Sequence, residues 1–444
     1  MAENRSDTLP KTTDVLIVGA GPTGLTLACR LAQAGVSHVV VDSALEGVNT
    51  SRAAVLHAGT LEALDVIGAT DLLLRAGRTI SDFALRDNDE TLLRLDLSVL
   101  PSEYAYSLIL PQSRTEAVLA SVLARFGKSV LRPWRAVSLD QDRDGVTVRL
   151  AREQGTEPAP MTAIRARYVL GCDGMHSRVR EACEIPFLGS AHAESFVLAD
   201  VRMHWSLPVT QSQLFVSDGG VLAVTPLPGD QYRVVATLDP APEQPTREDI
   251  EGLLRRRGPT PPAVVHDLVW GGCLRVHRRL AERYRLGRVL LAGDAAHVHS
   301  PAVGQGVNIG IQDALALGDH VIHALSTSAP PPELDAYERV RRPVAEAGLR
   351  LTDRLTRIAL LRSPVFRLLR NRTVAALGRS ARFRQRLHSS CPNWRIERAL
   401  RCGRFSQPAL IGPTPPPYSR LAPSLAPAWA EGVDVDRSKQ TSSM

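Results

Sequence analysis

A glycine-rich turn between an apolar run and a helix-like stretch constrains this chain most. Residues 14–18 are apolar and β-branched after Asp14, and Gly19-Ala20-Gly21-Pro22-Thr23-Gly24 follows directly. Residues 25–35 have helical spacing, and residues 38–41 form a second apolar run that ends at Asp42. This order of strand, glycine turn, helix, strand and acid supports a G-x-G-x-x-G match. The sequence therefore predicts an α/β fold with a dinucleotide site near its N-terminus.

The turn and the acid have complementary predicted roles. In the turn, Gly19 allows the tight bend and Gly21 allows a pyrophosphate to approach the backbone. Gly24 allows the helix to pack closely on the strand. The free N–H groups at the start of the helix favour a phosphate there. Asp42 is placed to accept hydrogen bonds from a ribose, and we predict Ser43, the next residue, to bind the cofactor as well. The predicted cofactor-binding residues of the turn are Gly19, Gly21, Pro22, Thr23 and Gly24.

Composition indicates an ordinary globular chain. With 444 residues, 44% of them hydrophobic, the chain is long enough for two or three domains. Residues 1–13 are polar and lack the apolar segment of a signal peptide. The six cysteines are scattered, without the spacing of a metal site. We therefore expect a cytoplasmic protein without a bound metal, and no nucleic-acid motif accompanies its net charge of +7.

Two further stretches make the pattern specific. Gly171-Cys172-Asp173-Gly174, continuing to Arg180, resembles the Asp-Gly fingerprint of class A flavoprotein monooxygenases. Gly293-Asp294-Ala295-Ala296-His297, continuing from Pro301 to Asn308, resembles the Gly-Asp fingerprint of the same enzymes. The chain thus resembles FAD-dependent aromatic and polyketide hydroxylases with a p-hydroxybenzoate hydroxylase-like fold, over most of residues 12–325.

This resemblance implies a set of flavin contacts. Asp294 would accept hydrogen bonds from the ribityl hydroxyls, and a helix N-cap is a second interpretation that is compatible with the first. Gly304 and Gly306 would let the backbone approach the flavin ring. Asp173 would serve the nicotinamide and pyrophosphate regions, with Arg180 either anchoring that turn or pairing with Asp173. The implied cofactor-binding residues are Arg52, Gln112, Val137, Asp173, Gly293, Asp294, Pro301, Gly304, Gln305, Gly306, Val307 and Asn308.

The expected organisation is an α/β dinucleotide-binding fold of the glutathione-reductase type that is interrupted by a second sheet. Period-two apolar runs between residues 195 and 272 predict a mostly antiparallel sheet. Many relatives add a thioredoxin-like C-terminal domain after the region that ends near Arg404, and we expect this chain to lack that domain. The predicted domains are an FAD-binding domain (12–78, 103–190 and 273–342), a substrate-binding β domain (79–102 and 191–272), a basic helical segment (343–404) and a Pro-rich, partly disordered tail (405–444).

The resemblance implies an NAD(P)H-consuming monooxygenase. NADPH or NADH would reduce the flavin, O2 would add as a C4a-hydroperoxide, and one oxygen atom would pass to an aromatic or polyketide-like small molecule in secondary metabolism. No acid–base side chain is required, so we name no certain catalytic residue beyond the Pro301 loop beside the flavin. Baeyer–Villiger oxidation, epoxidation and antibiotic inactivation stay open as alternatives. A flavin-dependent halogenase is disfavoured because the W-x-W-x-I-P motif is absent.

The basic segment has two interpretations. Residues 343–404 contain fifteen arginines and three acidic residues, a composition that suits an anionic membrane or an acyl carrier protein. Apolar residues at helical spacing instead favour packing in the core or in a homodimer. We prefer packing, and expect no nucleic-acid partner and no stable membrane insertion. The apolar residues in question are Leu355, Ile358, Leu361 and Val365.

Overall fold

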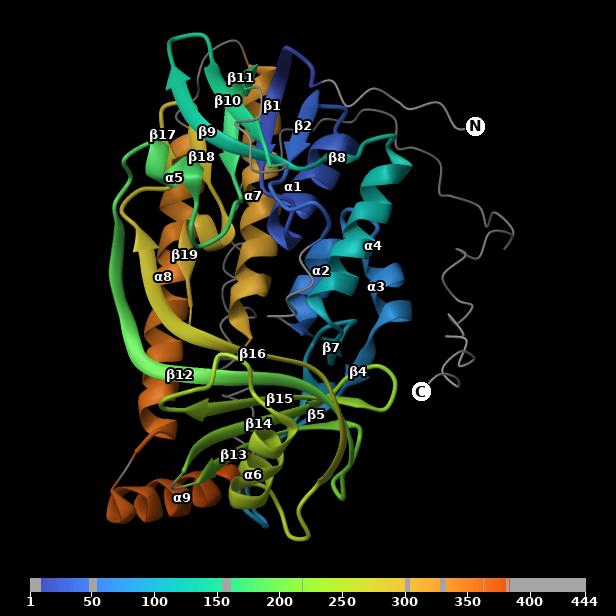
Figure 1. Ribbon diagram of the computed structural model, residues 1–444, viewed down its shortest axis with the longest axis vertical. Coiled ribbons are helices and arrows are strands. Elements are labelled where there is room, and N and C mark those ends of the chain that lie inside the picture. Colours follow the sequence, from blue (N-terminus) through green and yellow to red (C-terminus); the bar gives the residue numbers. More distant parts are fainter. Residues whose placement is uncertain are drawn as a thin grey trace, which may run out of the picture. The chain divides into compact units, whose positions relative to one another are not determined.

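The computed structural model describes residues 9–47, 54–153, 161–217, 219–299, 304–327, 333–361, 363–380 and 383. The chain divides into two compact units, residues 1–399 and 400–444. The second unit, which contains the whole predicted tail (405–444), lies outside the described residues. Two eight-stranded sheets organise the first unit (Figure 1).

The first sheet contains the predicted dinucleotide-binding strands. β1 (Thr12–Val18) lies between β11 (Met161–Gly171) and β2 (His38–Val41) and runs parallel to both. The strand order is β17-β18-β11-β1-β2-β8, and the hairpin β9–β10 extends from β11. The other strands of this sheet are β8 (Val130–Leu131), β9 (Trp134–Gln141), β10 (Val146–Arg152), β17 (Arg285–Leu286) and β18 (Val289–Leu291).

Helix α1 (Pro22–Gln33) begins three residues earlier than the sequence pattern predicts. Pro22 occupies the first helical position, where its fixed φ suits the helix and its missing N–H costs no hydrogen bond. The helix ends in a Schellman motif: Gly35 has φ +70°, and the N–H of Val36 donates to the carbonyl of Leu31. Predicting the helix from apolar spacing alone misses this first turn, because the turn is specified by Pro22 and not by an apolar residue.

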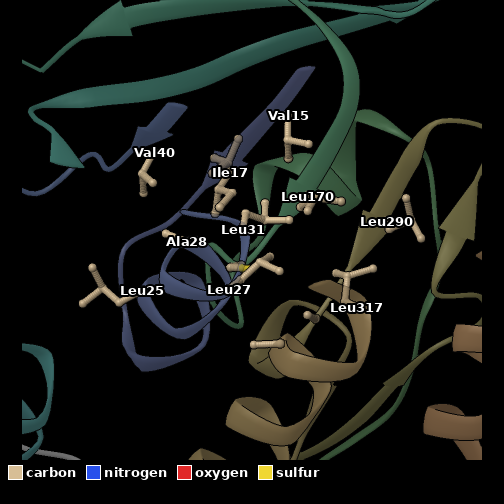
Figure 2. Packing of buried hydrophobic residues seen from close by; sticks show 14 of the residues in the cluster. Val15, Ile17, Leu25, Leu27, Ala28, Leu31, Val40, Leu170, Leu290 and Leu317 are labelled. Carbon is tan, nitrogen blue, oxygen red and sulfur yellow. The ribbon is translucent and has the colours of Figure 1, made fainter. Parts of the chain in front are cut away.

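A single large core joins this sheet to two helices. α7 (Gln305–Ser326) crosses α1 closely, since a Cβ at Gly318 would lie 2.9 Å from Cγ of Arg30. Figure 2 shows Ile17 of β1, Leu31 of α1 and Leu317 of α7 among the buried side chains of this core. The predicted strand, helix and strand are therefore held together by apolar burial, the dominant favourable contribution to folding.

The second sheet is mostly antiparallel, as predicted. Its order is β19-β16-β12-β15-β14-β13-β5-β6, and among these pairs β13 and β5 run parallel. β12 (Phe187–His204) and β16 (Val264–Ala281) are 18 residues long, so the predicted domain boundaries fall inside two continuous strands. The remaining strands are β5 (Asp82–Asp87), β6 (Glu90–Asp96), β13 (Gln211–Ser217), β14 (Gly220–Pro226), β15 (Gln231–Leu238) and β19 (His297–Val298).

Shorter elements connect the two sheets and cover them. α6 (Arg247–Arg257) packs Ile250, Leu253 and Leu254 on one face of the second sheet. These elements also include β3 (Val55–Leu56), α2 (Ala58–Asp65), α3 (Thr70–Ala76), β4 (Arg78–Ile80), η1 (Leu97–Val99), β7 (Ser107–Ile109), α4 (Gln112–Arg125), α5 (Arg178–Ala182) and η2 (Gly293–Ala295).

The basic segment forms two helices instead of one amphipathic stretch. α8 (Glu333–Ala359) ends shortly before α9 (Pro364–Arg379), and Pro364 starts the second helix. Leu355, Ile358 and Val365 are exposed, so core packing was the wrong prediction for these three side chains. Homodimer packing stays a prediction. Within the described ranges, no helix has the length and apolar character needed to cross a membrane.

Candidate functional site

The three glycines of the first turn occupy different surroundings. Gly19 has φ +101°, and a Cβ there would lie 2.4 Å from the carbonyl oxygen of Cys172. A Cβ at Gly24 would lie 1.9 Å from the carbonyl oxygen of Gly19. Gly21 caps α1, and no heavy atom lies within 4 Å of the position of its Cβ. Gly19 and Gly24 are thus required by the fold, whereas Gly21 leaves open space at the N-terminus of α1.

Asp42 is fixed by three hydrogen bonds at the end of β2. Its Oδ2 accepts from the N–H of Ala20 at 2.6 Å, and its Oδ1 accepts from the N–H of Ala44 at 2.9 Å. Nη1 of Arg132 donates to the same Oδ1 at 2.7 Å. A carboxylate has about four acceptor positions, so roughly one stays available to a ribose hydroxyl. Arg132 was missed by the sequence analysis, because an arginine ninety residues away carries no local signal.

Two other predicted residues lie next to Asp42. Ser43 follows it in the chain and is exposed. Val137 is an exposed residue of β9, the strand whose first N–H, from Trp134, donates to the carbonyl of Asp42. The structure thus brings Asp42 and Ser43 to the start of β9, the strand that carries Val137.

The Asp-Gly turn is tied to the Gly-Asp turn by a buried arginine. Nη1 and Nη2 of Arg180 donate to the carbonyl oxygens of Ala295 and Met175, each at 3.0 Å. Its guanidinium also lies 3.9 Å from the ring centroid of Phe187. This geometry favours the anchoring interpretation of Arg180.

Asp173 is the half-buried acid of the Asp-Gly turn. Its Oδ2 accepts from the N–H of Val179 at 3.2 Å, while its Oδ1 is buried without a hydrogen-bond partner. Burial raises the pKa of this carboxyl above its ordinary value, despite hydrogen bonds that act in the opposite direction. Asp173 therefore retains an unused polar atom in the predicted cofactor region.

Thr23 joins the first turn to the Gly-Asp turn and to α7. Gly293 has φ +60°, and a Cβ built there would lie 2.5 Å from Oγ1 of Thr23. A Cβ built at Gly310 would lie 2.6 Å from the same oxygen. Asp294 is exposed, and its Oδ1 is the one neighbour, at 4.0 Å, of a Cβ built at Gly306. Gly310, four residues beyond Gly306, is a close-packing residue that the sequence analysis missed.

The start of α7 is shaped by its cap and first turn. Gly304 caps the helix in the left-handed region, with φ +61°. A Cβ built on Gly304 would lie 3.4 Å from Cβ of Val55. Gln305 is buried, and its Oε1 has no partner, whereas Val307 is half-buried. Asn308 is fully buried: Nδ2 donates to the carbonyls of Val55 and Gly304, and Oδ1 accepts from the N–H of His57. The Asn308 side chain is therefore occupied by the backbone around the site.

Three further predictions have different outcomes. Gln112 is the first residue of α4, and its Nε2 donates to Oε1 of Glu116 at 2.8 Å. Burial raises the pKa of Glu116, partly offset by this hydrogen bond and by Arg132. Arg52 and Pro301 lie outside the described residues, so no placement is given for them.

A buried polar network lies behind the Gly-Asp turn and was not predicted. Nε2 of His297 lies 2.5 Å from Oδ2 of Asp313, and Nε2 of His299 lies 2.9 Å from Nδ1 of His297. Nε of Arg341 donates to Oδ1 of Asp313 at 2.6 Å. Burial raises the pKa of Asp313, but Arg341 and His297 lower it more, so that its net pKa is below the ordinary value. An acid among the apolar residues of α7 was the signal available in the sequence.

These observations fit a bound dinucleotide. Gly21 and Gly306 leave space beside the backbone, and a side chain at either position would take up part of that space. The N-termini of α1 and α7 supply N–H groups suited to an anion. Oδ1 of Asp173 in the Asp-Gly turn and Oε1 of Gln305 at the start of α7 are each buried without a hydrogen-bond partner. An orphaned buried polar atom is costly unless a ligand or water satisfies it. Residues present in the described part of the chain can therefore hold FAD.

Comparison with known proteins agrees with this geometry. A family model described as an FAD binding domain matches residues 12–352. The chain is 38% identical over 354 residues to 12-dehydrotetracycline 5-monooxygenase/anhydrotetracycline 6-monooxygenase of Streptomyces rimosus, covering 76% of this chain and 68% of that protein. It is 34% identical over 354 residues to pentachlorophenol 4-monooxygenase of Sphingobium chlorophenolicum, covering 78% and 65%. Fold and site together define a flavin-dependent monooxygenase. The chain belongs to the FAD-binding class A aromatic hydroxylase family.

Solved structures confirm the predicted fold class. The p-nitrophenol 4-monooxygenase of Pseudomonas putida superposes with a TM-score of 0.77 at 27% identity, covering 87% of this chain and 99% of that chain. The anhydrotetracycline hydroxylase of Streptomyces rimosus superposes with a TM-score of 0.70 at 34% identity, covering 85% and 75%. Both the parallel sheet and the mostly antiparallel sheet are therefore arranged as in this family.

Proposed function

We propose that this chain uses NAD(P)H and O2 to insert one oxygen atom into an aromatic or polyketide-like small molecule in secondary metabolism. The observation that carries the proposal is that the three turns contact one another, through Gly19 and Cys172, Thr23 and Gly293, and Arg180 and Ala295. Gly21 and Gly306, in two of these turns, keep open space beside them. The names of several relatives support the substrate class, since they include monooxygenases of anhydrotetracycline, rifampicin and pentachlorophenol.

The proposed cofactor contacts follow from the positions described above. The N-terminal N–H groups of α1 and the open side of Gly21 would face the pyrophosphate, and Asp42 the adenosine ribose. The N-terminus of α7 would stabilise negative charge on the flavin by about 0.3–1 kcal/mol at an exposed site. When bound, the flavin supplies hydride acceptance and oxygen activation, while the chain orients the substrate and excludes water. Asn308 acts indirectly, by fixing the backbone at Val55, His57 and Gly304.

The substrate would lie against the face of the second sheet that is opposite α6. Phe196 and Leu198 of β12 cluster there with Val235, Trp270 and Leu274. The same face carries a buried ion pair, in which Nε and Nη2 of Arg233 donate to the two carboxylate oxygens of Asp200, each at 2.7 Å. We propose that the apolar side chains of this face select the substrate ring system.

The direct test is NADPH oxidation in air by purified yellow protein, with and without polycyclic phenols and quinones. We expect substrate-stimulated oxidation and a product mass increased by one oxygen atom. Oxidation that yields hydrogen peroxide with every compound would contradict hydroxylation of that panel. Product structure distinguishes hydroxylation from Baeyer–Villiger insertion or epoxidation, and loss of antibiotic potency would identify inactivation. Parallel assays with NADH determine which nicotinamide cofactor is used.

The predicted organisation is retained as part of the proposal. Residues 12–78, 103–190 and 273–342 would bind FAD, and residues 79–102 and 191–272 would bind substrate. We also propose a cytoplasmic location, which suits the free thiols of Cys29, Cys172, Cys183 and Cys273.

A further inference from the structure

Helix α9 presents large apolar side chains to solvent. Val365, Phe366, Leu368 and Leu369 are 72%, 60%, 53% and 60% exposed. They recur at helical spacing and continue towards the exposed Leu377, and we call this set the outer face of α9. Contiguous exposed apolar patches on a protein of this kind mark interaction sites.

The opposite face of α9 is already packed, so the outer face is not an unpacked core face. Nη2 of Arg370 donates to the carbonyl of Val216 at 3.1 Å, and Nδ2 of Asn371 donates to Oδ2 of Asp87 at 2.5 Å. Val374 and Ala375 pack against a cluster of buried residues, which are Leu92, Val216 and Val221. Figure 1 shows α9 at an angle to the end of α8, which Arg370 caps through the carbonyl of Ala359 at 2.8 Å.

Positive charge surrounds the outer face. Residues 354–379 contain seven arginines and no acidic residue. Arg357 pairs with Asp353 at 2.5 Å, but the exposed Arg354, Arg372 and Arg379 have no carboxylate partner within the described part of the chain. The surface is therefore complementary to one that is both apolar and anionic.

A second copy of the chain is a poor occupant, because a two-fold contact through α9 would bring arginines against arginines. An interfacial helix bearing arginines beside Phe and Leu matches the chemistry of a lipid headgroup boundary. We propose that the outer face of α9 docks the protein peripherally on an anionic lipid membrane. Phe366 and Leu369 enter the boundary between headgroups and acyl chains, and Arg372 and Arg379 contact the lipid phosphates. This proposal does not depend on the proposed reaction.

Vesicle co-sedimentation of the full-length protein tests it. We expect sedimentation with phosphatidylcholine vesicles that contain phosphatidylglycerol, and at least about tenfold weaker binding when salt rises to about 0.5 M, because salt screens the arginines. Phe366→Ser/Leu369→Ser and Arg372→Gln/Arg379→Gln should each weaken binding about tenfold or more. Matched controls are Val209→Ser/Val264→Ser and Arg255→Gln/Arg256→Gln, which alter exposed side chains elsewhere and should bind as the original protein does. FAD content and circular dichroism verify that every variant is folded.

Three results would overturn the proposal. One is absence of sedimentation at low salt, and another is equal binding to vesicles with and without phosphatidylglycerol. The third is a dimer, seen by light scattering, that Phe366→Ser/Leu369→Ser converts to monomer, which would assign the face to a second copy.

Discussion

Arg341 and Asp313 form an ion pair that is removed from solvent. Nε of Arg341 lies 2.6 Å from Oδ1 of Asp313, and the two side chains are 1% and 0% exposed. The pair links α8 to α7, and His297 links the same carboxylate to the Gly-Asp turn. One buried carboxylate, on α7, thus connects the Gly-Asp turn to α8.

Asp313→Asn should destabilise the protein by about 3–5 kcal/mol, because it leaves the charge of Arg341 buried without a counter-ion. Denaturant unfolding of the FAD-free protein measures this cost. The exposed pair of Arg30 and Asp319 supplies the control, since Asp319→Asn should cost less than about 1 kcal/mol. Adding Arg341→Met to Asp313→Asn should recover part of the loss. If the losses of unfolding free energy caused by Asp313→Asn and by Arg341→Met simply add in the double variant, the two side chains do not stabilise each other and the prediction is wrong.

Glu116→Gln should stabilise the protein increasingly as pH rises. Burial raises the pKa of Glu116 in the folded state above the unfolded value of about 4.3. The folded state then binds more protons, so ionisation costs stability as pH rises from about 4.3 through the folded pKa. Each unit of the pKa difference corresponds to about 1.4 kcal/mol.

Unfolding free energies of both proteins at about pH 5 and pH 8 measure this effect. We expect the advantage of Glu116→Gln to be larger at the higher pH. A difference that is the same at both values would exclude the raised pKa, and the exposed Glu282→Gln is the matched control.

Alanine at two glycines of the first turn should separate folding from cofactor binding. At Gly24 the new Cβ would meet a backbone oxygen at 1.9 Å, so Gly24→Ala should lose about 1–3 kcal/mol of stability or more. Gly21 has φ −73° and open surroundings, so Gly21→Ala should change FAD-free stability by less than about 1 kcal/mol. Its FAD affinity should nevertheless fall tenfold or more, equivalent to about 1.4 kcal/mol. Flavin fluorescence titration and thermal unfolding report the two quantities, and unchanged affinity in Gly21→Ala would place the pyrophosphate elsewhere.

Asn308→Asp should weaken both the fold and FAD binding. The change retains an acceptor for the N–H of His57 but removes both donors to the carbonyls of Val55 and Gly304. Each unsatisfied buried group costs about 1–3 kcal/mol. Asn371→Ala, at a partly exposed site on α9, should cost less than that. Retention of FAD through gel filtration, together with unfolding, distinguishes a loosened site from global destabilisation. Full FAD content in Asn308→Asp would show that this backbone position does not support the cofactor.

The sequence by itself determined the parts whose information is local. β1, the glycine turn, β2 and Asp42 are specified by residues within one short stretch, because apolar periodicity and glycine conformation act over a few residues. The mostly antiparallel sheet follows from the same kind of signal. The order of the three motifs along the chain then indicated the family.

Only the tertiary structure decided contacts between residues that are far apart in the chain. Arg132 reaches Asp42 across ninety residues, and Asp313 meets Arg341 because α8 packs on α7. Asn308 belongs to a cofactor motif, yet its side chain is used to hold the backbone of residues 55–57. Leu355 and Val365, which suit one amphipathic helix by spacing, lie on two helices and face solvent. Periodicity shows that a helix has an apolar face, but which surface covers that face depends on how the elements pack in space.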